Sequence, residues 1–172
     1  MSFGPGLRRL VLTVHVTCAV GWLGAVVAYL ALALAALTRG DGQTVRAAWI
    51  GMDVIARFVI VPLALTSVLV GVINALGTSW GLFRHYWVLV KLALTVLATV
   101  VLLLHMPTVT YHAGVAAASD GAGVGGLTGE IFHAGGGLIV LFATTVLSVY
   151  KPRGMTRYGW GKGKGTPGRS PG

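Results

Sequence analysis

The stretch that decides the fold is "LVLTVHVTCAVGWLGAVVAYLALALAAL", Leu10–Leu37, which contains no charged residue. A bilayer core about 30 Å thick is crossed by about 20 helical residues, so this segment is long enough to span it. The basic start "MSFGPGLRRL" is similar to the first part of a signal peptide. The apolar run that follows is far longer than the roughly 7–15 residues of a signal-peptide core. We therefore expect a first transmembrane helix here and no cleaved leader.

The composition of the whole chain agrees with a membrane protein. Of its 172 residues, 55% are hydrophobic and 10% are charged, whereas about a quarter of the residues of a soluble domain are charged. The net charge of +9 could indicate nucleic-acid binding, but many of the basic residues lie in the last part of the chain, beyond any apolar segment. That pattern indicates a membrane protein with a basic tail and resembles no nucleic-acid module.

Apolar segments with few charges predict four membrane spans, at about residues 10–37, 58–76, 86–106 and 131–150. They must be helices, because hydrocarbon offers no partners for unpaired backbone groups. The predicted fold is an all-α membrane protein, a four-transmembrane-helix bundle within residues 1–150. Residues 151–172 form a Gly-, Pro- and Lys/Arg-rich tail that we expect to be disordered. Its positive charges suit anionic lipid headgroups.

The distribution of Lys and Arg predicts the orientation, because basic residues accumulate on the cytoplasmic side. With four spans, both termini and the connection between spans two and three lie on one side. That side carries most of the basic residues, namely Arg8, Arg9, Arg84, Lys91, Lys151, Arg153, Arg157, Lys162, Lys164 and Arg169. All four acidic residues lie on the other side. The expected location is the bacterial plasma membrane, with both termini cytoplasmic.

The five histidines fall at two predicted depths. His15 and His85 lie towards the inner surface, and His105 and His133 lie towards the outer surface, with His112 beyond them. Two histidines at one depth on facing helices could ligate a b-type haem from both faces, and imidazole is a common metal ligand. Otherwise each ring bonds to a helix carbonyl or lies in headgroup water. Ionisable groups within a membrane favour function, so the predicted haem or metal ligands are His105, His133 and His15.

The position of His112 depends on Pro107, which lacks an amide hydrogen and disfavours α geometry in the residue before it. If the helix continues, His112 lies two turns beyond His105, on a shared face. If the helix stops, His112 is a loop residue. It is a secondary candidate for cofactor binding.

Three further features could contribute to a cofactor site. In "GEIFHAGGGLIV", Gly136 and Gly137 follow His133 on the same helical face, which indicates either a groove for a porphyrin edge or close helix packing. Arg57 either pairs with Asp53 one turn earlier or binds a haem propionate. Cys18 is expected to be a packed, inert thiol, because no nearby cation would stabilise a thiolate.

The segments "HVTCAVGWLGAVVAYLALALAAL", "GTSWGLFRHYWVLVK" through "LLLH", and "VLSVYKPRG" resemble a family of uncharacterised bacterial four-helix integral membrane proteins, classed under a domain of unknown function. The resemblance covers nearly all of the chain up to the tail and implies four helices but no activity. More loosely, His15 followed by Gly21, Trp22 and Gly24 is similar to the first helix of copper-resistance-type and b-type cytochrome membrane proteins. This similarity implies either haem or copper.

Three functions remain open at this point. The first is a small cytochrome b-like electron-transfer protein with haem b at His105 and His133, for which quinone would be a redox partner. The second is copper handling, because Met52, Met106 and the outer histidines combine thioether and imidazole ligands. The third is a cofactor-free accessory or assembly protein, with its tail binding lipid or a membrane partner, or with a second copy as partner. No motif for soluble catalysis is present.

Overall fold

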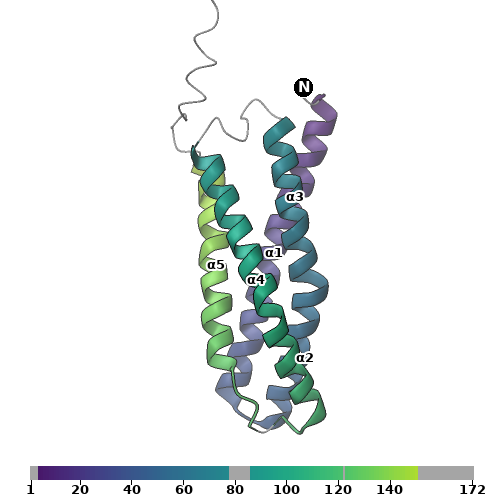
Figure 1. Ribbon diagram of the computed structural model, residues 1–172, viewed down its shortest axis with the longest axis vertical. Coiled ribbons are helices and arrows are strands. Elements are labelled where there is room, and N and C mark those ends of the chain that lie inside the picture. Colours follow the sequence, from purple (N-terminus) through teal and green to yellow (C-terminus); the bar gives the residue numbers. More distant parts are fainter. Residues whose placement is uncertain (1–3, 78–85, 122, 151–172) are drawn as a thin grey trace, which may run out of the picture.

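The computed structural model describes residues 4–77, 86–121 and 123–150. Every secondary-structure element in these residues is a helix. Four helical stretches are long and apolar enough to cross a membrane, which confirms the all-α four-helix prediction. They run alternately up and down as a bundle (Figure 1). We call the end where the first helix begins and the last one finishes the terminal end. The opposite end, with two short connections, is the loop end.

The first helix, α1 (Pro5–Arg39), contains the first predicted span. Its buried residues recur every three or four positions, as expected for one face packed along the bundle axis; they are His15, Cys18, Trp22, Val26, Tyr29, Ala33 and Ala36. Gly40 ends the helix in a left-handed conformation (φ 69°) with its amide bonded to the Ala36 carbonyl. Asp41 then caps the next helix by accepting a 2.8 Å hydrogen bond from the Thr44 amide. This tight link makes the two helices antiparallel.

The second stretch comprises α2 (Gly42–Ile55), the π-helical turn η1 (Ala56–Ile60) and α3 (Val61–Gly77). It is one continuous stretch from Gly42 to Leu76 by membrane-span criteria, so the predicted span at 58–76 covers only its second part. The first part is amphipathic and therefore less apolar on average. The wide turn, in which the Val61 amide bonds to the Ala56 carbonyl, directly precedes Pro62, which has no amide hydrogen to donate.

The remaining helices are α4 (Tyr86–Ala118) and α5 (Leu127–Tyr150). The third predicted span, 86–106, lies within α4, which continues through Pro107 for three more turns, one of the two alternatives that the sequence left open. The fourth, 131–150, lies within α5. His85 and the tail 151–172 lie outside the described residues. Both α1 and α4 pack against α2, α3 and α5, so α1 and α4 occupy opposite corners and face each other across the bundle axis.

The loop end carries a three-helix cap, formed by the last turns of α1, by α2 and by the last turns of α4. The helices α1 (35 residues) and α4 (33 residues) are about 50 Å long at 1.5 Å per residue, whereas α5 is shorter (24 residues). The centre of the cap contains Trp49 and Met52, each with 0% of its surface exposed. Several alanines let the helices approach closely; they are Ala33, Ala36, Ala48 and Ala116. This cap supports the loop-end side of the candidate site.

Candidate functional site

Glu130 is the centre of a polar cluster inside the bundle. Its side chain is 2% exposed, on the first turn of α5. The Tyr29 hydroxyl of α1 donates a 2.6 Å hydrogen bond to its Oε2 atom. The Nε2 atom of His105, on α4, lies 2.9 Å and 3.0 Å from the two carboxylate oxygens. Three helices thus each supply one member of a closed hydrogen-bonded set, as a buried carboxylate requires.

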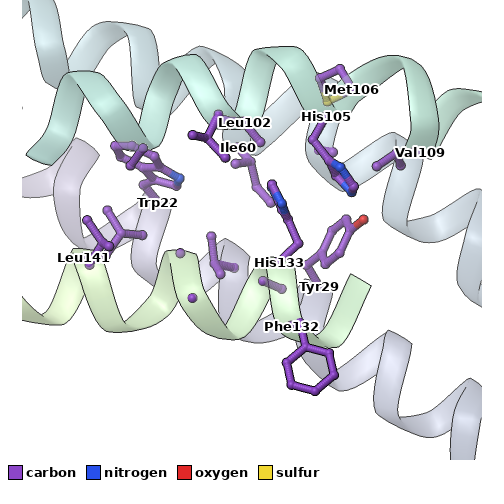
Figure 2. A pocket seen from close by; sticks show the side chains of 18 of the residues that line it. Trp22, Tyr29, Ile60, Leu102, His105, Met106, Val109, Phe132, His133 and Leu141 are labelled. Carbon is purple, nitrogen blue, oxygen red and sulfur yellow. The ribbon is translucent and has the colours of Figure 1, made fainter. Parts of the chain in front are cut away.

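His133 completes this group from the next turn of α5. Its ring stacks on that of His105, with centroids 3.8 Å apart and planes inclined by 16°. Figure 2 shows the two imidazoles face to face, with Tyr29 beside them. Among the described residues, no side chain or carbonyl forms a hydrogen bond with His133. The ring therefore has donor and acceptor capacity available to a bound molecule.

A cavity of about 340 Å³ adjoins this cluster between α1, α4 and α5. Tyr29, His105 and His133 line its polar part, and Trp22 and Leu141 line it further towards the terminal end (Figure 2). The wall is otherwise mainly apolar, with Ala56 and Ile60 contributed by the π-helical turn. This combination of an apolar cavity with a few convergent polar groups is typical of a small-molecule site.

Gly136 and Gly137, on the helical face of His133, line the same cavity. A Cβ atom built on either glycine would have no neighbour within 4 Å. These glycines therefore keep space open rather than allowing another helix to approach. Of the two interpretations left open by the sequence, the structure favours the groove.

The predicted haem pair does not fit this arrangement. An iron held by two histidines needs a nitrogen from each ring directed at it from opposite faces of the porphyrin. Rings stacked at 3.8 Å leave no space for a macrocycle between them. In addition, the His105 Nε2 atom already faces Glu130. Among the described residues, no group of three or more His, Cys, Asp or Glu side chains is arranged to hold a metal ion.

His15 lies apart from this site, towards the terminal end and about 21 Å from Tyr29 along α1 at 1.5 Å per residue. Its side chain is buried, and its Nε2 atom lies 3.4 Å from the Lys91 Nζ atom of α4. On the other side the ring packs against Gly71 of α3. The structure thus confirms two separate levels for the described histidines but joins His15 to a lysine rather than to another histidine.

His112 and Arg57 do not line the cavity. His112 is helical, because α4 continues past Pro107, but its ring stacks on Trp49 at 4.7 Å and its Nδ1 atom bonds to the Thr108 carbonyl at 2.9 Å. Arg57 forms the predicted pair with Asp53 at 3.3 Å and also donates to the Thr110 hydroxyl at 2.9 Å. Both side chains are therefore occupied by structural contacts in the cap region.

The sequence reasoning missed Glu130 and Tyr29. Glu130 was counted as one of the acids outside the membrane, although it lies three residues before His133 and hence on the same helical face. Tyr29 lies seven residues after Trp22, on the packed face of α1. Helical spacing could have indicated both residues, but not that they meet.

No protein-family model, curated protein or solved structure matches the chain. The resemblance to an uncharacterised four-helix membrane family stays a prediction, and the site has to be interpreted from its own chemistry.

Proposed function

We propose that this protein binds a membrane-soluble molecule of the quinone class, apolar in its body and carrying carbonyl or hydroxyl groups on its head. The observation that carries the proposal is His133, an imidazole without a hydrogen bond to the described residues at the polar part of an apolar cavity. A neutral imidazole offers one donor and one acceptor. It can therefore bind a quinone carbonyl or a quinol hydroxyl.

The bilayer is the source of the ligand in this proposal. Leu97, Val101 and Phe132 line the cavity and are 58%, 42% and 77% exposed. Exposed apolar residues on a membrane helix face lipid, so an apolar molecule reaches the cavity sideways between α4 and α5 without crossing water. The glycines on α5 leave room for a flat ring at this entrance.

The Tyr29–Glu130–His105 set provides a place for a proton beside the bound head. The Glu130 carboxylate and the His105 imidazole are in hydrogen-bond contact, and both are groups that can bind a proton. The His105 ring stacks on His133, so a change in charge at one ring acts directly on the other. The set therefore supports proton exchange with a quinol, in addition to binding.

Fluorescence quenching by decylubiquinone tests this function. Trp22 lines the cavity, so saturable quenching of the detergent-purified protein is expected, and Trp22→Phe should remove most of it. His133→Ala should weaken binding about tenfold, the effect of one buried hydrogen bond of about 1.4 kcal/mol. His112→Ala is the matched control, because this histidine stacks on Trp49 outside the cavity. Equal affinity in wild type and His133→Ala, or no saturable quenching, would refute the proposal.

We also propose an orientation of the bundle in the membrane. Arg8, Arg9 and Lys91 belong to the terminal end, whereas the acidic residues belong to the loop end or the first turn of α5. The positive-inside rule then makes the terminal end cytoplasmic in a bacterial plasma membrane. A Cys18→Ala chain with one cysteine at Gly123 should react with an impermeant maleimide from outside intact cells. Reaction only after the cells are opened would reverse the orientation.

Copper binding is a second candidate, favoured by Met106, which lines the cavity together with His105 and His133. Thioether and imidazole groups suit Cu(I). Competition with a colorimetric Cu(I) chelator should then show one bound ion, lost in Met106→Leu. Unchanged chelator absorbance in the presence of the protein would exclude this alternative.

A further inference from the structure

A second site is indicated near the terminal end, where Lys91 lies within the helical bundle without an acidic partner. Its ammonium group is 3.4 Å from His15 Nε2. All four acidic residues of the chain are elsewhere, since Asp41, Asp53 and Asp120 belong to the loop end and Glu130 is bonded to Tyr29 and His105. The positive charge of Lys91 is therefore not balanced by any acidic side chain of this protein.

His15 positions the ammonium group but cannot neutralise it. As the acceptor from Lys91, the Nε2 atom is unprotonated, so the proton of the neutral ring is on Nδ1. That atom is buried against α3 beside Gly71 and has no hydrogen-bond partner among the described residues. A neutral imidazole thus accepts one of the three ammonium hydrogens, and among the described residues no acceptor is found for the other two.

Arg57 is another cation on a membrane-length helix of this chain, and it has an acidic partner. Its guanidinium has both a carboxylate at 3.3 Å and a hydroxyl at 2.9 Å as partners. Cations on membrane helices are normally paired in this way, because an isolated charge there is costly. The contrast indicates that the counter-charge of Lys91 comes from outside the chain.

The depth of Lys91 indicates which anion is available. Tyr86 and Trp87 begin α4, and such aromatic residues prefer the headgroup level of a bilayer. Lys91 is four residues further on, about 6 Å deeper at 1.5 Å per residue. The ammonium group itself lies beside His15, so the residue that carries it is about one helical turn from the headgroup level. Phosphate groups are the anions found there.

We propose that Lys91, positioned by His15, binds a phosphate group at the terminal end of the bundle, between α1 and α4. The phosphate comes either from the headgroup of an anionic phospholipid or from a small phosphate in solution. The site is separate from the quinone cavity, because a different set of residues forms it. The test of the phosphate site is therefore independent of the test of quinone binding.

Native mass spectrometry of the full chain tests the site with an equimolar mixture of phosphatidylglycerol and phosphatidylcholine of identical acyl chains. Wild type should retain phosphatidylglycerol about tenfold more strongly, the effect of one charge-assisted contact. Lys91→Met should abolish this preference, and Lys91→Arg should largely keep it. Arg8→Gln is the control, since it removes one exposed charge at the same end. Circular dichroism confirms that each variant is folded.

Inorganic phosphate added in excess separates the two sources. If phosphatidylglycerol stays bound, the lipid itself is the ligand. If inorganic phosphate displaces it in wild type, the site accepts a phosphate group from solution, which also supports the assignment. If Lys91→Met keeps the wild-type preference, or Arg8→Gln lowers it equally, the positive charge acts only through the general surface potential and the proposal is wrong.

Discussion

The two polar clusters lie on the same faces of α1 and α4 but are completed in different ways. Near the loop end, Glu130 has Tyr29 and His105 as partners, and opposite charges are available within the chain. Near the terminal end, the side chain that contacts the Lys91 ammonium group among the described residues is His15, which cannot supply a negative charge. The loop-end cluster is therefore expected to stabilise the fold by itself, whereas the terminal-end pair is expected to depend on a ligand.

Packing also differs between the two ends, and the loop end again has the stronger contacts within the chain. The cap at the loop end buries large apolar side chains, with Trp49 and Met52 at 0% exposure. Towards the terminal end the buried side chains include, besides Trp22 and Leu141, four small polar ones, namely Ser67, Thr95, Thr99 and Thr144. Each of these threonines donates its hydroxyl hydrogen to a carbonyl of its own helix. The loop end thus has the stronger core, and substitutions there should cost more.

Glu130→Ala should have the largest effect and tests the comparison directly. It removes a buried carboxylate and leaves the Tyr29 hydroxyl and the His105 ring without their partner, at an expected cost of about 3 kcal/mol. Reversible unfolding in mixed micelles, followed by circular dichroism, measures this change. Glu130→Gln should cost less, since an amide oxygen still accepts hydrogen bonds.

His15→Ala is the counterpart of this change at the other end. A single polar contact between membrane helices contributes about 0.6 kcal/mol on average, so the loss should be much smaller than for Glu130→Ala. Equal losses in the two variants would show that the two clusters do not differ in the way proposed.

Gly71→Ala should have an intermediate effect, because a Cβ atom there would lie 3.1 Å from the Cε1 atom of His15. Overpacking of this kind costs about 1–3 kcal/mol unless the ring can shift. Gly24→Ala is the matched control, since a Cβ atom on that helical glycine meets nothing within 4 Å and alanine favours a helix. A gain in stability for both variants would mean that the His15 ring is not clamped against α3.

Lys91→Met should change the stability in lipid-free detergent by less than about 1 kcal/mol, because it removes an uncompensated charge rather than one partner of an ion pair. Added phosphatidylglycerol should then raise the unfolding free energy of wild type but not of the variant, since a ligand stabilises only the state that binds it. A large loss without lipid would indicate that Lys91 has a structural partner within the chain.

The architecture was predictable from the sequence, because the length of an apolar segment relates directly to bilayer thickness. The predicted bounds of the spans differ from the helices where packing, rather than the length of an apolar segment, determines how far a helix extends. The helix α2 was missed because Arg46 and Asp53 lower its mean hydropathy, although Val45, Ala48, Trp49 and Met52 give it a buried face. The sequence left open whether α4 continues past Pro107, because packing decides it: the burial of Val109, Ala113 and Ala116 holds the next turns in the helix.

The candidate site was predictable in part. His105, His133, Gly136 and Gly137 share one cavity as expected, because their depths and helical faces follow from residue spacing. Which groups contact one another could not be derived in the same way. The bond from Tyr29 to Glu130 joins residues 101 positions apart, and only the packing of α1 against α5 determines it. The haem interpretation depended on the relative position of two rings, which residue spacing does not give; the structure has them stacked with centroids 3.8 Å apart.

Asp41 should give the smallest effect, because this exposed residue only caps α2. The hydrogen bonds that Asp41 accepts from Thr44 lower the pKa of its carboxyl group. A group with a lowered pKa in the folded state contributes stability above its ordinary value of about 4 and loses that contribution as the pH falls through the lowered pKa. The difference in unfolding midpoint between wild type and Asp41→Ala should therefore shrink below about pH 4. Asp41→Asn, a neutral cap at every pH, should show no such dependence at this position, and a pH-independent gap between wild type and Asp41→Ala would mean that the carboxylate charge contributes nothing to the cap.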